Sequence, residues 1–337
     1  MKAKRIVSIL LTGSMLLSLL PVSALAAAPV FDAPAQTTAK KAAPLVQEAD
    51  ASRSTEEEAA TRSSRDLDAE NGTAESFTIQ LNADGTPTES GDDDHWHYDP
   101  NSNGRLYLTE GVFTLQPSKE PNAESALQVV ELNIEQKADF AGGTVGRLTY
   151  NCGTISNGTF QGYVYNGYSY DDDGEFIPGV ILDGTFQGEV TNDGVISGGL
   201  FQGTVYNYEI ISNGNFQGDV RNYRTISGGT FEKDMTLMNY DAPITIKDGL
   251  FDGAVVTGGC NRPLSISGGL FTKAVNLSSI DPTNLQITGG YFVSKPTLPE
   301  DSDISFTSVS DQNGRHFQVI VNNAWSETGY NELYVPR

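Results

Sequence analysis

Isoleucine and phenylalanine return at fixed positions over residues 153–292, in the pattern Ile-x-x-Gly-x-Phe. The pattern occurs eight times, with its phenylalanines 26, 15, 15, 15, 20, 20 and 21 residues apart, and four copies continue as Phe-Gln-Gly-x-Val-x-Asn. Self-similarity at a regular period is the sequence signature of a repeat architecture. The copies begin at Ile155, Ile181, Ile196, Ile211, Ile226, Ile246, Ile266 and Ile287.

The alternation of residue types within each unit predicts strands. Over residues 215–220, a strand turns Phe, Gly and Val to one side and Asn, Gln and Asp to the other. Each coil would thus offer apolar side chains to an interior, and amides and acids to water. We therefore expect an all-β fold, a parallel β-solenoid (β-helix) with coils of 15–21 residues, right-handed connections and irregular β caps. A β-sandwich also has short strands, but it does not need the same residue at the same place in every unit.

Stacked coils place equivalent residues in columns along the axis. Identical amides in one column can hydrogen-bond to each other, which predicts structural roles for them. Glycines two residues before and after each phenylalanine suit positions where a Cβ would clash or φ must be positive. The expected amide columns are Gln161, Gln187, Gln202 and Gln217, and Asn192, Asn207 and Asn222.

Composition divides the chain into five segments. Residues 1–26 have the basic start, apolar stretch and Ala-Leu-Ala cleavage site of a secretory signal peptide. Residues 27–75 carry almost no large apolar side chains, which predicts a disordered linker. An N-terminal β cap with the first coils is expected over 76–139, solenoid repeats over 140–295 and a C-terminal β cap over 296–337.

Three features refine this division. Phe140 lies 20 residues before Phe160, a spacing found later in the repeat, so coiling is expected to begin there. The 26-residue step after Phe160 exceeds the 15-residue step by 11, and the excess near residues 167–176 is expected to protrude as a loop. Trp325 and Tyr330 are expected to cover the last phenylalanine layer.

The signal peptide predicts a protein that is secreted or held at the cell surface. Its apolar stretch is too short for a membrane span, and no second run of spanning length follows. We expect no membrane-spanning segment, and neither a lipid-anchor cysteine nor a sorting motif is visible.

The net charge argues against some classes of partner, and the positions of the two cysteines argue against a disulfide between them. A formal net charge of −22 and a pI near 4.3 argue against nucleic acid and anionic lipid surfaces, which both require basic patches. Six phenylalanine steps, counted from Phe140 to Phe251, separate Cys152 from Cys260, or about 29 Å. Because a disulfide needs Cα atoms within about 7 Å, no intramolecular disulfide is expected.

Tyrosines near the ladder asparagines are the candidate ligand-binding residues. Three of them follow an asparagine at the same corner of successive coils, and two precede one. Together they would form an exposed aromatic stripe that can stack on sugar rings or bind protein. The alternative is a self-stacking ladder that only stabilises the corner. These residues are Tyr208, Tyr223 and Tyr240, and Tyr165 and Tyr206.

Metal sites have weaker support. Asp171 and Asp173, or the acidic run 92–94, could bind calcium through carboxylate oxygens. Neither stretch fits a complete calcium-binding loop, and a solvated acidic loop is the alternative. His95 and His97 could hold a transition metal, but without an evident third ligand a surface strand end is the plainer interpretation. No other cofactor is expected.

Catalysis lacks a distinctive motif. Glu189, Asp219 and Asp234 would share one outward column, as carboxylates do in β-helix enzymes that cleave polysaccharides, but they form no tight acid pair. All three histidines lie outside the regular repeat, which argues against Ser-His-Asp chemistry. We assign no catalytic residue.

The motif Ile-Ser-x-Gly-x-Phe-x-Gly-x-Val-x-Asn, behind a signal peptide ending in Ala-Leu-Ala, resembles the repeats of secreted or cell-surface β-helix proteins of Gram-positive gut bacteria. The stretches 96–99 and 106–108 are similar to the start of such regions. The resemblance covers roughly residues 95–295 and implies an exported, adhesin-like or carbohydrate-contacting protein. It transfers no catalytic residues, and this chain departs from the larger members because no wall anchor is visible.

Three functions follow as hypotheses. The first is a non-enzymatic exported protein that presents a repetitive face to an extracellular glycan or a host surface protein. The second is a polysaccharide lyase or hydrolase of the parallel β-helix type. The third is a structural spacer without a ligand.

Overall fold

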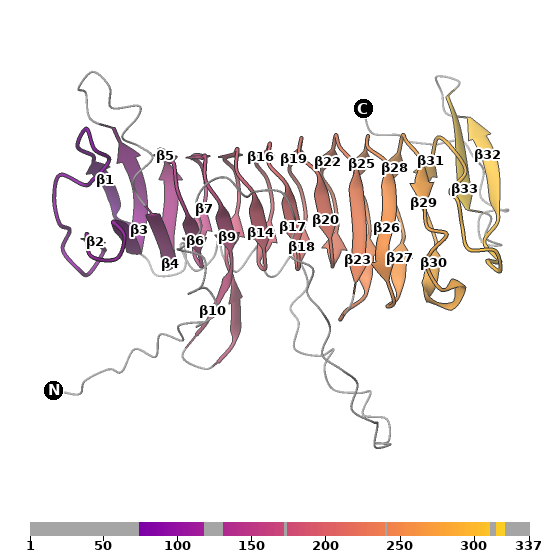
Figure 1. The fold of residues 1–337 in the computed structure, drawn as a ribbon, viewed down its shortest axis with the longest axis horizontal. Helices are drawn as coiled ribbons and strands as arrows, with labels where there is room; N and C mark the ends of the chain where they lie inside the picture. The colour runs from indigo at the N-terminus through magenta and orange to yellow at the C-terminus, as the bar shows by residue number, and fades with distance from the viewer. Residues whose placement is uncertain (1–73, 118–130, 172–173, 240, 311–314, 321–337) are drawn as a thin grey trace, which may run out of the picture. The chain divides into compact units, whose positions relative to one another are not determined.

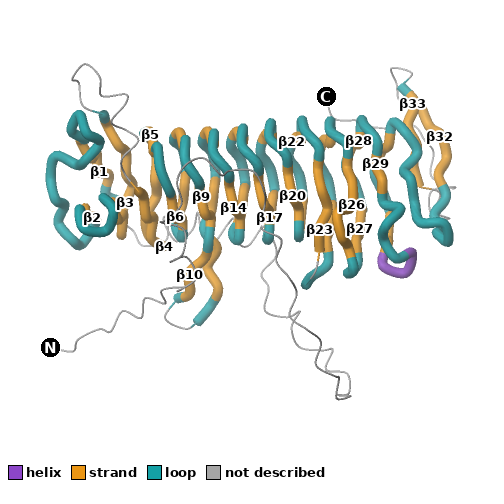
Figure 2. Tube along the Cα trace, viewed as in Figure 1, coloured by secondary structure: helices purple, strands orange, loops and turns teal. Residues whose placement is uncertain are grey.

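The computed structural model describes residues 74–117, 131–171, 174–239, 241–310 and 315–320. Contacts divide the chain into two units, Met1–Ser52 and Arg53–Arg337, and every described residue belongs to the second. There the chain winds into stacked coils of short strands joined by turns (Figures 1 and 2). The predicted all-β solenoid with parallel strands is confirmed. The signal peptide and most of the linker lie outside the described residues.

Each regular coil contributes three strands. The first carries Val-x-Asn, and stacking of these strands forms the asparagine sheet, in which Val190 pairs with Val205 and Asn192 with Asn207. Its strands are β6 (Thr149–Asn151), β9 (Val164–Asn166), β14 (Val190–Asn192), β17 (Val205–Asn207), β20 (Val220–Asn222), β23 (Met235–Asn239), β26 (Val255–Cys260) and β29 (Val275–Asn276).

The second strand of each coil ends in the repeat isoleucine, and these strands form the isoleucine sheet, in which Ile181 pairs with Ile196. The 3-10 turn η2 (Pro282–Asn284) precedes its last strand and is the purple segment in Figure 2. The strands are β7 (Thr154–Ile155), β12 (Val180–Ile181), β15 (Val195–Ile196), β18 (Ile210–Ile211), β21 (Thr225–Ile226), β24 (Ile244–Ile246), β27 (Leu264–Ile266) and β30 (Leu285–Ile287).

The third strand ends in the repeat phenylalanine, and these strands form the phenylalanine sheet, in which Phe186 pairs with Phe201. The strands are β5 (Thr144–Val145), β8 (Thr159–Phe160), β13 (Thr185–Phe186), β16 (Leu200–Phe201), β19 (Asn215–Phe216), β22 (Thr230–Phe231), β25 (Leu250–Phe251), β28 (Leu270–Phe271) and β31 (Tyr291–Phe292).

Long strands begin the solenoid at its N-terminal end. Strands β3 (Arg105–Gln116) and β4 (Glu131–Gly142) pair in parallel, and β4 continues into both the asparagine and the isoleucine sheets. Strand β1 (Ser76–Gln80) pairs in parallel with the end of β3, and β2 (Trp96–Asp99) pairs antiparallel with its start.

The register at β4 corrects one expectation. Phe140 pairs with Ile155, so it belongs to the column of the repeat isoleucines. Val145 pairs with Phe160 and takes the first place in the phenylalanine column. Spacing between phenylalanines assigned Phe140 to the wrong column because a phenylalanine here takes the isoleucine position, one regular 15-residue step before Ile155, and a valine takes the phenylalanine position 15 residues before Phe160.

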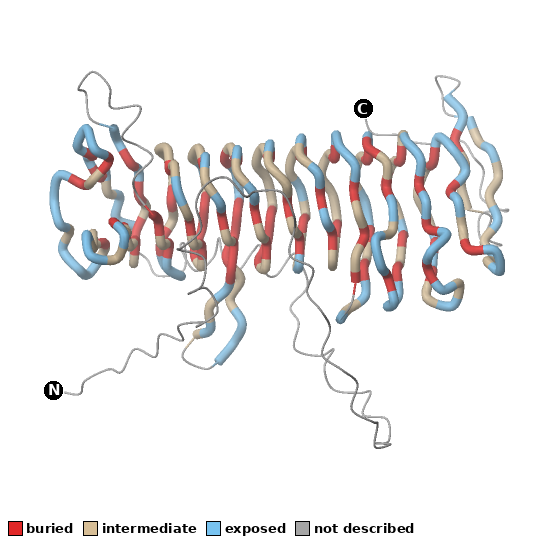
Figure 3. The backbone as a smooth tube through the Cα atoms, viewed as in Figure 1, coloured by how far each residue is buried: buried red, intermediate tan, exposed pale blue. Residues whose placement is uncertain are grey.

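The phenylalanine column forms a continuous stack inside the solenoid, where Figure 3 shows the buried inner positions of successive coils. From Phe160 to Phe292, neighbouring rings lie 4.5–4.9 Å apart between centroids and within 10° of parallel. Every ring is at most 1% exposed. Fully burying one such side chain contributes about 1.5–3 kcal/mol, so the repeat supplies most of its own core.

Asparagines form a second internal column, a hydrogen-bonded ladder. The Nδ2 of each donates to the Oδ1 of the next at 2.6–2.7 Å, from Asn151 to Asn222. The expected bonding along the axis is confirmed for this column, but these amides face the interior, not water. The reason is that each lies two residues after an inward residue, which is Thr149 for Asn151 and a valine for the others. The expected glutamine column lies exposed, and no hydrogen bond joins its members in the described part of the chain.

The repeat glycines serve two purposes. Gly214, two residues before Phe216, has φ +132°, a region that side chains rarely adopt. Gly218, two residues after Phe216, is crowded, because an added Cβ would lie 2.0 Å from the carbonyl oxygen of Gly203 one coil below. Both explanations offered by the sequence therefore apply, each at its own corner.

A hairpin leaves the solenoid between the strands of Asn166 and Val180. Strands β10 (Tyr168–Tyr170) and β11 (Phe176–Pro178) pair antiparallel and extend away from the coils in Figure 1. The predicted protruding insertion is confirmed.

Antiparallel strands close the C-terminal end. Strand β33 (His316–Ile320) pairs with β32 (Phe306–Ser310) and with Phe292 of β31. The ring of Phe306 meets that of Phe292 edge-on at 5.7 Å. Trp325 and Tyr330, which were expected to cover this layer, lie outside the described residues.

Both cysteines are free, as predicted. The ladder register runs from the coil of Cys152 to that of Cys260 in six steps, so the predicted separation holds although Phe140 was assigned to the wrong column. Within the described residues, no helix has the length and apolar character needed to traverse a bilayer.

Candidate functional site

The outer column of the asparagine sheet consists of the residues between each valine and asparagine. Because these two neighbours point inward, the residue between them faces outward. In register, this column holds two of the predicted tyrosines, Tyr165 and Tyr206, which are half-buried and separated by Thr191. Arg221 follows Tyr206, with its guanidinium carbon 5.3 Å from the ring centroid. Tyr150 precedes Tyr165 in the same column.

The corner column consists of the residues that directly follow the ladder asparagines: Gly167, Asp193, Tyr208 and Tyr223 in successive coils. Their backbone N–H groups bond to the coil below at 2.7–2.8 Å. The rings of Tyr208 and Tyr223 stack at 4.4 Å and 18°, and Tyr208 is 39% exposed. Tyr240, the third tyrosine expected at this corner, lies outside the described residues.

Side-chain contacts link the two columns. The Tyr165 hydroxyl donates to Asp193 Oδ2 at 2.5 Å across one coil. Burial raises the pKa of Tyr165, and the bond to Asp193 raises it further. Burial also raises the pKa of Asp193, although its bond to Tyr165 acts in the opposite direction. The structure therefore places Tyr165, Tyr206, Tyr208 and Tyr223 in adjoining columns on one side of the solenoid, and one of them, Tyr165, bonds to the partly desolvated carboxylate of Asp193.

Aromatic side chains also cluster on the β10–β11 hairpin, which the sequence had predicted only as a loop. Tyr168, Tyr170 and Phe176 are 41%, 59% and 45% exposed. Their ring centroids lie 5.0–6.3 Å from each other. Alternating residues on both sides of a Gly-containing acidic turn are a hairpin signal that could have identified this cluster.

The acidic turn of this hairpin contains one described calcium candidate, Asp171. Asp171 Oδ1 accepts the backbone N–H of Glu175 at 2.8 Å, and Gly174 donates to the Asp171 carbonyl. Asp173, the second calcium candidate, lies outside the described residues. In the part of the chain that the structure describes, no three His, Cys, Asp or Glu side chains are grouped to hold a metal ion.

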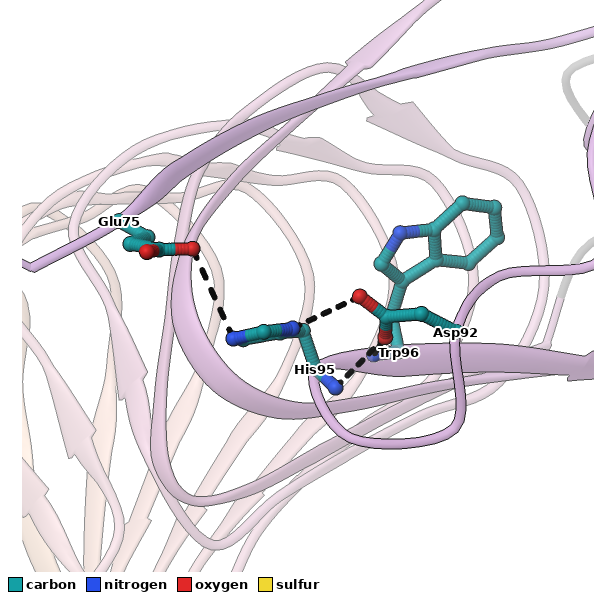
Figure 4. Close-up of polar contacts among 4 residues, drawn as sticks. All are labelled: Glu75, Asp92, His95 and Trp96. Carbon is teal, nitrogen blue, oxygen red and sulfur yellow. Dashed lines mark hydrogen bonds and ion pairs between the residues drawn. The ribbon is translucent and has the colours of Figure 1, made fainter.

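The predicted histidine pair does not converge on one point. His95 lies between two carboxylates, with Nδ1 2.7 Å from Asp92 Oδ2 and Nε2 3.7 Å from Glu75 Oε2 (Figure 4). The ring of His97 instead stacks on Tyr107 at 4.5 Å. Hydrogen bonds from the His95 backbone and side chain lower the pKa of Asp92 to about 2, and the bond to Asp92 raises the pKa of His95.

The acidic column expected from the sequence is present beside the tyrosines. Glu189, Asp219 and Asp234 each directly precede a strand of the asparagine sheet, and their strands stack in register. Asp234 Oδ1 accepts the backbone N–H of Ala254 at 2.9 Å, which gives this carboxylate a structural role.

Comparison with known proteins identifies no family for this chain. The chain matches no protein-family model, and no curated protein or solved structure shows significant similarity to it. The assignment to β-solenoids therefore rests on its parallel coils, asparagine ladder and phenylalanine stack.

Proposed function

We propose that the protein is an exported, non-enzymatic binding module, secreted or displayed at the cell surface. In this adhesin-like role, its tyrosine-lined side would contact an extracellular glycan or a host surface protein. The observation that carries the proposal is the gathering of tyrosines from separate coils, including the stacked and partly exposed pair Tyr208 and Tyr223.

Rigidity supports this proposal. The tyrosines lie on, or directly after, strands whose register is held by buried asparagine bonds and stacked phenylalanine rings. A surface fixed in this way loses little conformational freedom when a ligand binds. Repeated weak contacts along the coils then add through multivalency.

The enzymatic alternative has one supporting observation. Asp219 and Asp234 occupy equivalent positions in adjacent coils, about 4.8 Å apart along the axis, and paired carboxylates can cleave glycosidic bonds. Incubation with acidic polysaccharides, with and without calcium, distinguishes the two functions. Release of new reducing or unsaturated ends would replace the binding proposal with an enzyme.

Screening against glycans and host surface proteins tests the binding function. We expect the protein to bind at least one class of ligand and the double variant Tyr208→Ala/Tyr223→Ala to bind at least tenfold more weakly. Tyr291→Ala is the matched control, because Tyr291 is a half-buried tyrosine on the phenylalanine sheet. Unchanged binding by the double variant would show that the proposed surface is not the binding site. If neither the binding assay nor the cleavage assay gave a signal, the structural-spacer hypothesis would be favoured.

A further inference from the structure

The β10–β11 hairpin is not needed to complete its coil. Its two ends meet, since the N–H of Gly179 donates to the carbonyl of Gly167 at 2.7 Å. One coil later, Asp193 and Gly194 alone join Asn192 to Val195 at the same corner. Residues 168–178 are therefore an addition to a coil that closes without them.

This added hairpin exposes its aromatic side chains on one face. Tyr170 pairs directly with Phe176, and Tyr168 lies two residues along the same strand, whereas Ser169 and Ile177 pair on the opposite face. All three aromatic residues are more than two-fifths exposed. Contiguous exposed aromatic surface is costly in water and is typical of binding sites.

The hairpin begins at the tyrosine-lined corner. Gly167 is a member of the corner column, and Tyr168 follows it directly. The Cys152 thiol donates to the Tyr168 carbonyl at 3.4 Å, which fixes the base of the hairpin to the coil below. Along the corner, the hairpin is followed by Asp193, then Tyr208 and Tyr223. The three coil steps together span about 14 Å.

We propose that the hairpin aromatics and the corner column, Asp193, Tyr208 and Tyr223, form one carbohydrate-binding site for an uncharged glycan chain. This inference rests on the proposed binding function and narrows its ligand. Sugar rings would stack on the aromatic side chains through their C–H faces. The Asp193 carboxylate would accept hydrogen bonds from sugar hydroxyls, and hydrogen bonds to an ionised acceptor are stronger than neutral ones.

Charge selects against an acidic glycan. Among the described residues, the basic side chain next to the corner tyrosines is Arg224, which lies 3.8 Å from Glu209. Arg147 lies 3.4 Å from Glu131, and Arg221 lies over the ring of Tyr206. Like charges brought together at an interface oppose binding. The described acidic residues on the hairpin and in the adjoining coil are Asp171, Glu175, Asp183, Glu189 and Asp193.

Deleting residues 168–178 tests the site. The deletion joins Gly167 to Gly179, restores the 15-residue step and leaves the corner tyrosines in place. We expect an unchanged circular dichroism spectrum and at least a tenfold loss of affinity for neutral oligosaccharides, measured by fluorescence anisotropy with end-labelled hexose and N-acetylhexosamine chains. The substitution Tyr168→Thr/Tyr170→Thr/Phe176→Thr, which keeps the hairpin, should give the same loss. Ile177→Thr on the opposite face is the control and should bind normally.

The outcomes separate this inference from the broader function. If neutral glycans bind and the hairpin variants retain full affinity, the hairpin is not part of the site, although the tyrosine-lined surface remains. Preference for uronic-acid or sulfated chains would overturn the charge argument. Binding only to protein partners, or self-association lost with the hairpin aromatics, would overturn the carbohydrate assignment. Failure of the Tyr208→Ala/Tyr223→Ala variant to alter any binding would remove the proposed function itself.

Discussion

At the scale of single residues, the asparagine ladder shows how an amide can belong to a core. Asn207 bonds through Nδ2 to Asn222 and accepts at Oδ1 from Asn192, and its Nδ2 also reaches the carbonyls of Glu209 and Thr225. A buried polar group is stable only when it is paired, and here each coil supplies the partner for the next. The ladder therefore links the coils by bonds that a shifted register would break.

Asn207→Ala should lower the free energy of unfolding by about 1–3 kcal/mol, because it removes the donor to the buried Oδ1 of Asn222 and one acceptor of the Asn192 amide. The control is Gln202→Ala, which removes an exposed amide from the glutamine column and should change stability by about 0.5 kcal/mol or less. Urea denaturation measures both. Equal losses would mean that the internal ladder contributes no more than a surface amide.

His95 predicts a pH dependence at the N-terminal end. Its pKa is raised above 6.5 by the bond to Asp92, so its stabilising contribution is complete below that value and is lost as pH rises through the folded-state pKa. The Asp92 pKa is lowered from 3.8 to about 2, so its contribution is present above 3.8 and is lost as pH falls through 2. The pair is therefore most stabilising at pH values between 3.8 and 6.5, where Asp92 is ionised and His95 is protonated. Glu75 and Asp94 also favour the charged imidazole.

We expect His95→Gln to lose more stability at pH 5.5 than at pH 8.5, relative to the unmodified protein, in thermal unfolding of the full chain. Asp92→Asn should reproduce this difference, since it removes the partner carboxylate. Asp93→Asn leaves the pair intact and should keep the original pH profile. A difference that does not vary with pH would show that the pair does not couple protonation to folding.

At the scale of elements, the unit of the solenoid is a coil and not a strand. Most strands are only two or three residues long, too short to be stable alone, and each gains its hydrogen bonds from the coils before and after it. The hairpin is a further example of this rule, because it interrupts the chain without changing the coil. Eleven additional residues are accommodated because they leave and return at one corner, without altering the register of any sheet.

Removing one whole coil should therefore be tolerated. Deletion of residues 194–208 joins Asp193 to Glu209, which places Ile210 where Val195 was. We expect a folded protein with an unchanged circular dichroism spectrum and a reduced free energy of unfolding, because stability in stacked repeats is close to a sum over units and interfaces. Deletion of residues 194–201 removes part of a coil and should prevent folding, since it moves inward residues outward. Equal behaviour of the two deletions would contradict this account.

At the scale of the whole molecule, the ends and the net charge set limits on interaction. Phe306 covers the last phenylalanine ring edge-on, and antiparallel strands flank both ends of the parallel stack. Antiparallel pairing differs from the parallel register by which one coil stacks on the next. The charge of −22 disfavours acidic partners, which agrees with the uncharged glycan proposed for the hairpin and corner column.

The amino-acid pattern alone predicts the repeat, the stacking of like residues, the place of the insertion and the separation of the cysteines, because each follows from a period that every coil must share. Tertiary structure decided which residues share a column where that period is interrupted, as for Phe140, and which amides are inside. It also showed that the insertion is a hairpin with one aromatic face, whose base lies one coil step from Asp193. These features depend on turn geometry and on contacts between coils, which spacing along one chain does not encode.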